Sequence, residues 1–132
     1  MDMREFFKLA TGEIAGPIRV GRVRPKIQSA LDASTGAVWL SRESLEKQFA
    51  RHGRLNTAYY GYLRYAVERG EAFRLDGNRV GLVSDLRHML HHRLHVVVKV
   101  TGAHDELYAI SFYPLRERDW DRTERKYNRI PN

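Results

Sequence analysis

The fold of this chain is decided by residues 94–113, which read LHVVVKVTGAHDELYAISFY. Apolar and β-branched residues dominate 94–101, a composition typical of a β-strand. A short turn begins at Gly102, and 106–113 is again rich in strand-forming residues. We therefore predict two antiparallel strands joined by a short loop, with Pro114 ending the second strand.

Side chains on a strand alternate between its two faces, and this alternation singles out Lys99. One face of 94–101 is wholly aliphatic, with Leu94, Val96, Val98 and Val100. The other face holds Lys99 together with His95, Val97 and Thr101. A lone strand lysine is most often simply exposed to solvent, but a cation on a rigid element inside a cleft can hold a phosphate.

The return strand offers hydroxyl groups, and the register decides which of them reach Lys99. A symmetric four-residue turn pairs Lys99 with Tyr108 and Val96 with Ser111. A change of one residue in register moves the other set of side chains to the lysine face. The sequence leaves both registers open.

Upstream of this hairpin, the apolar spacing changes from helical to alternating at Gly70. The patterns predict these elements in order: a strand at 38–40, a helix capped by Ser41 and ending near His52, a second helix from Asn56 or Thr57 to Gly70, and a β-hairpin at 72–83 around Asp76-Gly77. The expected fold class is α+β, a helical hairpin packed on a roughly four-stranded antiparallel sheet. The compact domain is expected at 37–115, with an N-terminal arm at 1–36 and a charged tail or helix at 116–132.

Composition and charge narrow the function classes. The chain has 132 residues, enough for one domain, with 23 Lys and Arg against 16 Asp and Glu for a net charge of +7. This excess favours a polyanionic partner, and Arg19 and Arg22 lie in an acid-free basic stretch that we expect to bind it. The absence of a long apolar run argues against a membrane protein, and we expect a cytoplasmic location. The absence of cysteine excludes thiol nucleophiles and thiolate metal sites.

The histidines suggest two different readings. Four of them share a short segment: His88, His91, His92 and His95. They lack the carboxylates of a familiar zinc motif, so we expect no metal and no cofactor. His52 stands apart, beside Arg51 at the end of a predicted helix. It is either a cation stabilised by the helix dipole or a general acid or base near a phosphate.

An ordered set of residues resembles a pattern found in phage nucleases. The set comprises Val38-Trp39-Leu40-Ser41, Ser44-Leu45-x-Lys47, Arg51-His52, Tyr59/Tyr60, Leu63, Gly70, Val97-Val98-Lys99-Val100-Thr101 and Leu107-Tyr108-Ala109-Ile110-Ser111. It is similar to the phage members of the barnase–EndoU–colicin–RelE nuclease superfamily, found at the C-terminus of Mu F-like head-morphogenesis proteins. The resemblance implies a metal-independent, toxin-like ribonuclease of phage or prophage origin that acts in the cytoplasm of a bacterial host.

The resemblance also implies roles for individual residues. His52 and Lys47 match the helix motif, Lys99 the strand lysine and Ser111 the hydroxyl. His52 would act as base or acid, and Lys99 with Arg51 would stabilise the charge on the phosphorane.

Ser111 is the fourth catalytic residue, and it or a tyrosine would orient the phosphate. The remaining residues are expected to bind the substrate: Lys47 and Tyr108 would contact the RNA, and Tyr59 or Tyr60 would stack on a base.

One departure from the family pattern leaves a second function open. The Pro-Glu that follows the family's histidine is Gly53-Arg54 here, so an acidic partner for His52 is missing. The alternative is a non-catalytic module that binds nucleic acid or protein on a nuclease-like scaffold. In either case RNA is the expected partner, an immunity or phage protein is a further candidate partner, and a membrane is not expected.

Overall fold

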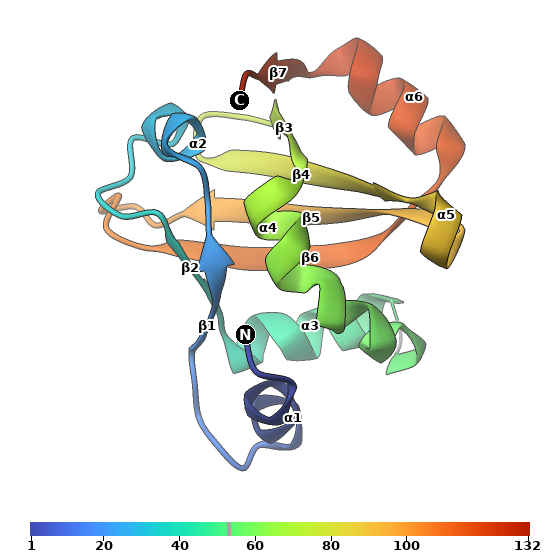
Figure 1. Ribbon diagram of the computed structural model, residues 1–132. Coiled ribbons are helices and arrows are strands. Elements are labelled where there is room, and N and C mark those ends of the chain that lie inside the picture. The colour runs from blue at the N-terminus through green and yellow to red at the C-terminus, as the bar shows by residue number, and fades with distance from the viewer. Residues whose placement is uncertain (53) are drawn as a thin grey trace.

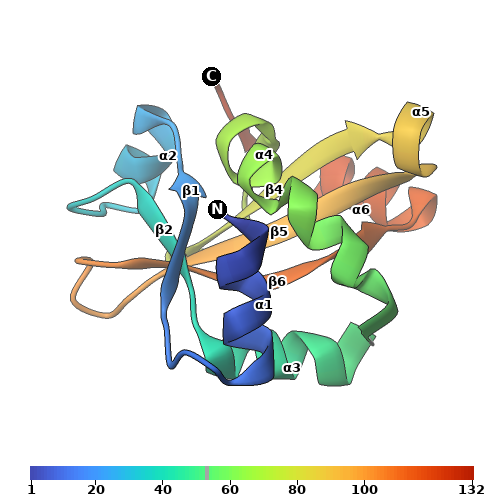
Figure 2. The same ribbon diagram turned by 60° about the horizontal axis from the view of Figure 1, so that its bottom comes forward.

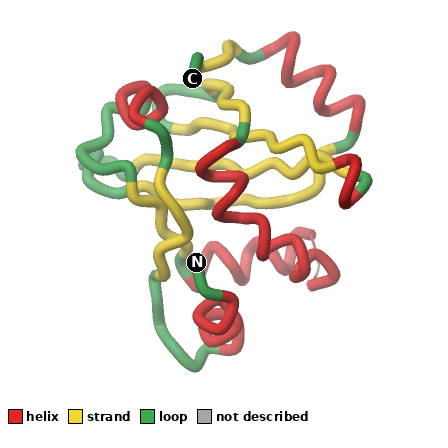
Figure 3. The backbone as a smooth tube through the Cα atoms, viewed as in Figure 1, coloured by secondary structure: helices red, strands yellow, loops and turns green. Residues whose placement is uncertain are grey.

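The computed structural model describes residues 1–52 and 54–132, and the side chains of all residues except 52–56. Helices and strands are mixed along the chain (Figures 1 and 3). The elements are α1 (Met3–Thr11), β1 (Ile18–Arg22), α2 (Pro25–Ala30), β2 (Ala37–Leu40), α3 (Arg42–His52), the 3-10 helix η1 (Arg54–Tyr62), α4 (Leu63–Arg69), β3 (Glu71–Arg74), β4 (Arg79–Leu86), α5 (Arg87–Leu90), β5 (His92–Val100), β6 (Leu107–Leu115), α6 (Glu117–Lys126) and β7 (Asn128–Ile130).

The described residues form one seven-stranded sheet in the order β1-β2-β6-β5-β4-β3-β7. Four of the five predicted strands, β3, β4, β5 and β6, form its antiparallel centre. The fifth, predicted at 38–40, is β2. Three strands extend this centre, and the β2–β6 pair is parallel. The α+β class is therefore confirmed, whereas the prediction of a four-stranded antiparallel sheet is only part of the observed mixed sheet.

Helices cover both faces of the sheet. Figure 2 shows α1 and α4 on one side and α6 on the other. The main core lies under α1 and α4, where Leu94, Val96 and Val98 of β5 are completely buried. A smaller core lies under α6, where Trp120 packs edge-on against Phe73 with ring centroids 5.6 Å apart. The alternation predicted for β5 therefore separates the main core from the face that carries Lys99.

The N-terminal 36 residues differ from the predicted arm because they belong to the folded unit. Phe6 and Leu9 of α1 and Val20 of β1 are fully buried in the main core. The apolar positions of α1 lie on one helical face, and burying them offsets the entropy of ordering the segment. Arg24 fixes the segment to α4, since its guanidinium donates to two carbonyl oxygens at the end of that helix, at 2.9 and 2.8 Å.

The predicted helical hairpin is present with an irregular second arm. Ser41 caps α3 as expected, since its hydroxyl accepts from the backbone N–H of Ser44 at 3.1 Å. The second arm starts as the 3-10 helix η1 and becomes α-helical only at Leu63. Aromatic residues and Gly61 in η1 have low helix propensity, which agrees with this start.

The C-terminal half contains two corrections. β6 does not end before Pro114 but continues to Leu115, and Pro114 lies opposite Leu94 of β5. On its other side β6 pairs with β2 only at Leu107 and Tyr108, so that edge is open beside the proline and needs no N–H there. Residues 116–132, predicted as a charged tail or helix, form the helix α6, but the strand β7 that follows it and pairs with β3 was not predicted.

Candidate nucleic-acid interface

A β-bulge in β6 brings the hydroxyl-bearing side chains to the face of Lys99. Lys99 lies opposite Tyr108, as the symmetric turn predicts, but Val97 rather than Val96 lies opposite Ser111. The register shifts between Val97 and Val98, which leaves Ile110 without an opposite residue. Without this extra residue, Tyr108 and Ser111 would face opposite sides of the sheet. With it, both hydroxyls share the face of Lys99.

Three hollows lie end to end along this face. The first, of about 450 Å³, is lined by Lys99 and Tyr108 together with Ser41 and Ser44 at the start of α3. A small second hollow of about 70 Å³ is lined by Lys47, Gln48, Arg51, Ile110 and Ser111. The third, of about 470 Å³, again includes Arg51, Ile110 and Ser111 and reaches α6. Because Ile110 lines all three hollows, we treat them as one feature and call it the β6 groove.

Helix α3 forms one wall of the groove, and Gln48 fixes its position. The Gln48 side-chain amide donates to the carbonyl oxygen of Ala109 in β6 at 3.4 Å, and its oxygen accepts from the hydroxyl of Tyr60. Ser44, Lys47 and Arg51 follow one another at helical spacing and line the groove. The predicted substrate contacts on α3 therefore lie along β6.

The groove carries positive charge. Lys99 and Arg51 are exposed, and among the described residues neither takes part in an ion pair. Lys47 is paired with Glu43 at 3.1 Å, but both side chains are more than 70% exposed, so this pair contributes little. Lys99 and Arg51 are therefore the groove cations whose charge no ion pair with the described part of the chain neutralises.

The two predicted hydroxyls on β6 have different surroundings. The hydroxyl of Tyr108 donates to the carboxylate of Glu106 at 3.1 Å. Burial raises the pKa of Tyr108 most, and the Glu106 carboxylate raises it further. Tyr108 therefore stays protonated near neutral pH, and its one O–H can donate to a phosphate in place of Glu106. Ser111 is half-buried in the middle of the groove, where Arg51 lines the same hollows.

His95 lies on the same face as Lys99, and the sequence reasoning gave it no role. It is 6% exposed, and its Nδ1 lies 2.8 Å from the hydroxyl of Tyr113. Its Nε2 is directed at the backbone of Gly81, because a Cβ placed there would lie 2.5 Å from that nitrogen. Burial lowers the pKa of His95 to about 4, so the ring is neutral at pH 7.

Two predicted base-stacking tyrosines belong mainly to the core. Tyr60 is 2% exposed and stacks on Phe6 with ring centroids 4.8 Å apart, so the prediction that it binds a base is wrong. Tyr59 is half-buried, packs against the same core, and makes an edge contact with His92 at 6.1 Å. Neither tyrosine lines the three hollows that form the groove.

The predicted basic contacts at Arg19 and Arg22 are separate from the groove. Both arginines are exposed on β1, at one edge of the sheet, two strands from β6. Neither lines the groove hollows. The structure thus brings together Lys47, Arg51, Lys99, Tyr108 and Ser111, and leaves these two arginines outside.

His52 is the last residue of α3, but its side chain lies outside the described residues, as does Gly53 altogether. Its predicted role as acid or base therefore stays a prediction. Among the described residues, no group of three or more His, Asp or Glu side chains could hold a metal ion. In the same part of the chain, no helix combines the length and the apolar character that crossing a membrane requires.

Several groove residues were missed by sequence reasoning. Arg79 on β4, Arg122 on α6 and Ile110 at the bulge all line the groove. The two arginines come from elements whose position depends on tertiary packing, so no local pattern indicated them.

No family model, no curated protein and no solved structure matches this chain.

Proposed function

We propose that the protein is a ribonuclease that holds a single RNA strand in the β6 groove and cleaves it without a metal ion. The observation that supports this most is the convergence of Lys99, Arg51, Ser111 and Tyr108 along one bulged strand. Cations and hydroxyl donors on rigid elements suit a phosphodiester and, more strongly, the extra charge of its transition state. The sequence resemblance to phage nucleases points in the same direction.

The proposed reaction is transesterification by the neighbouring hydroxyl. The ribose 2′-oxygen attacks phosphorus and loses its proton to a base, while the bond to the 5′-oxygen breaks and that oxygen receives a proton. Lys99 and Arg51 stabilise the phosphorane charge, and Ser111 or Tyr108 donates to a non-bridging oxygen. His52 is assigned the proton transfer on the basis of the sequence alone. The product is a 2′,3′-cyclic phosphate, formed in the cytoplasm of a bacterial host.

The test is cleavage of a long single-stranded RNA in EDTA by the purified chain and its variants. We expect wild type to release fragments with cyclic phosphate ends, and Lys99→Ala and His52→Ala to lose about 100-fold or more in rate. Lys8→Ala removes an exposed lysine of α1, which is not among the groove residues, and should cleave like wild type. Products with only 5′-phosphate ends, or a strict requirement for Mg²⁺, would contradict the mechanism.

A second candidate is binding without cleavage, and the state of His95 favours it. His95 is the one histidine among the described residues that line the groove, and its lowered pKa and burial make it a poor proton carrier at neutral pH. A groove with cations but no competent base would bind RNA only. Under this alternative wild type shows steeply salt-dependent binding and no fragments, and His52→Ala binds like wild type.

A further inference from the structure

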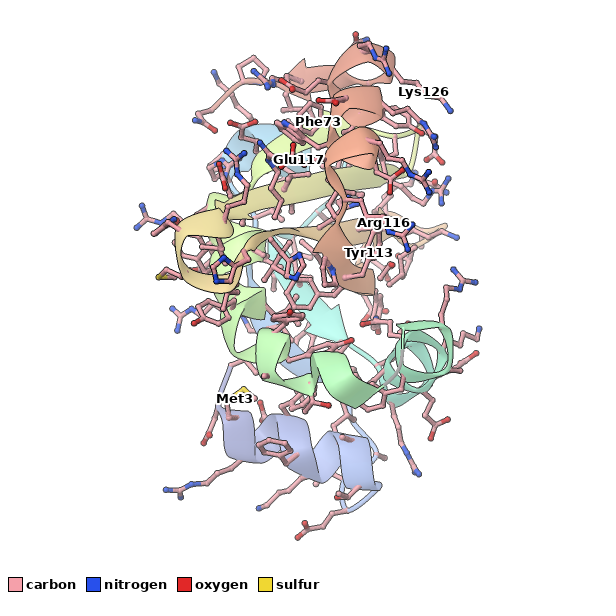
Figure 4. All side chains as sticks on the ribbon, turned by 90° about the vertical axis from the view of Figure 1, so that its right-hand side faces the viewer. Met3, Phe73, Tyr113, Arg116, Glu117 and Lys126 are labelled. Carbon is pink, nitrogen blue, oxygen red and sulfur yellow. The ribbon has the colours of Figure 1, made fainter. Side chains whose placement is uncertain are left out.

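The end of the β6 groove under α6 is larger than a phosphate requires. This third hollow, of about 470 Å³, lies between α6 and the outer face of β4, β5 and β6. Sites for small organic ligands begin at about 300 Å³. In Figure 4, α6 and α3 lie on the same side of the molecule, and Tyr113 lies on the strand between them. We call this hollow the α6 cleft, and it has room for a ring system as well as a sugar.

The lining of the α6 cleft suits a flat, mostly apolar ring. Its apolar surface comes from Leu75, Val97, Ile110 and Leu115. Two aromatic rings, Tyr113 and Tyr127, complete it. Aromatic side chains stack on nucleic-acid bases in single strands, because every base has a π-face.

Polar groups at the rim of the α6 cleft can form hydrogen bonds with the edge of such a ring and can pair with the negative charge of the backbone attached to it. The Asp119 carboxylate lines the cleft, and the Arg122 guanidinium lies 3.8 Å from it. Arg79 lines the opposite side and is paired with Asp76 at 2.7 Å. A carboxylate acceptor with two arginines around an apolar floor fits a base attached to a negatively charged backbone better than a purely apolar ligand.

The α6 cleft is continuous with the phosphate-binding part of the groove. Arg51 and Ser111 line both the cleft and the small hollow next to it. A phosphate held by these two side chains therefore lies at the mouth of the cleft, and the nucleoside attached to it is directed either into the cleft or along β6. We propose that the α6 cleft binds one base of that RNA strand, with Tyr127 as its stacking surface. This inference rests on the proposed function.

The test measures RNA binding separately from cleavage. A short, fully 2′-O-methylated RNA cannot undergo attack by its own 2′-oxygen, and its affinity is read by fluorescence anisotropy in EDTA at several salt concentrations. Tyr127→Ala should bind about 5- to 100-fold more weakly with an unchanged salt slope, since stacking releases no counterions. Arg51→Ala should instead reduce the slope, by about 0.7 for each lost phosphate contact.

Matched controls separate the α6 cleft from aromatic surface elsewhere. Tyr127→Phe keeps the ring and should bind within about 3-fold of wild type. Tyr65→Ala removes a tyrosine that does not line the groove, 51% exposed on α4, and should bind like wild type. A second measurement needs no protein variant. In wild type, replacing the nucleotides one at a time by an abasic residue should weaken binding at one position by the factor that Tyr127→Ala shows.

The outcomes distinguish this inference from the proposed function. If wild type binds RNA and Arg51→Ala weakens it, while Tyr127→Ala and every abasic RNA bind normally, the cleft does not bind a base and the RNA groove stands. If wild type binds no RNA, both proposals are overturned. If Tyr127→Ala does not fold, the abasic series decides, since a uniform response along the strand contradicts a single base site.

Discussion

Buried His95 makes the stability of the protein sensitive to mild acid. Its ring is 6% exposed and contacts the hydroxyl of Tyr113 through Nδ1, while Nε2 has no partner among the described residues. Burial lowers its pKa from 6.5 to about 4. As the pH falls from 6.5 to about 4, His95 becomes protonated in the unfolded chain but stays neutral in the folded chain. Unfolding therefore becomes easier, and stability is lost as pH decreases from about 6.5 to 4.

The size of the effect follows from the two pKa values. The full difference corresponds to roughly 3 kcal/mol at about 1.4 kcal/mol per pH unit, and about 2.4 kcal/mol of it is lost between pH 7 and pH 4.5. A domain of this size has a total stability of about 5–15 kcal/mol, so the loss is readily measured. The other charged groups that line the same cleft are Arg79 on β4, Arg51 on α3, and Asp119 and Arg122 on α6.

The assay is urea unfolding, followed by tryptophan fluorescence, at pH 7 and pH 4.5. His95→Gln removes the titrating ring, so this variant should lose about 2.4 kcal/mol less than wild type between the two pH values. His88→Gln changes an exposed histidine of α5 and should lose as much as wild type. Equal losses in wild type and His95→Gln, or an NMR titration of the His95 ring near pH 6.5, would refute the reasoning.

Three further substitutions test contacts that hold the fold together. Gly81→Ala places a Cβ 2.5 Å from Nε2 of His95 and should lower the free energy of unfolding, measured in urea, by about 1–3 kcal/mol. Adding His95→Ala should restore part of that free energy. An unchanged free energy of unfolding in Gly81→Ala would show that the His95 ring does not contact this strand. Arg24→Ala removes two hydrogen bonds to the end of α4 and should cost about 1–3 kcal/mol, whereas Lys26→Ala, at an exposed position, should change stability by less than about 0.5 kcal/mol. Equal effects of the two substitutions would contradict the role of Arg24 in fixing the N-terminal segment to α4. Trp120→Ala empties the core beneath α6 and should cost about 3–5 kcal/mol by the same assay, so a cost below about 1 kcal/mol would mean that α6 does not depend on this contact.

Local patterns in the sequence predicted the central elements of the fold. The alternation in 94–101 placed Lys99 on the face away from the main core, and Ser41 marked the start of α3. A symmetric loop was one of two registers that the sequence left open, and the structure selects its pairing of Lys99 with Tyr108. These features depend on residues close in sequence, where backbone geometry alone fixes which side chains share a face.

The remaining site depends on contacts between distant segments. The bulge at Ile110 brings Ser111 to the face of Lys99. The sequence of β6 contains no pattern that indicates where a bulge inserts an extra residue. Tyrosine is a residue type that often stacks on nucleic-acid bases, but Tyr60 is buried by its packing on Phe6.

By itself, the sequence determined the α+β class, the basic charge of the chain and the strand face on which Lys99 lies. Only the tertiary structure decided that α1 and β1 complete the core, that α6 lies on the outer face of the sheet, and that the α6 cleft opens there. The physical reason is that an amphipathic segment shows which of its faces will be buried, but not which distant surface will bury it. That choice is made by the free energy of packing the whole chain at once.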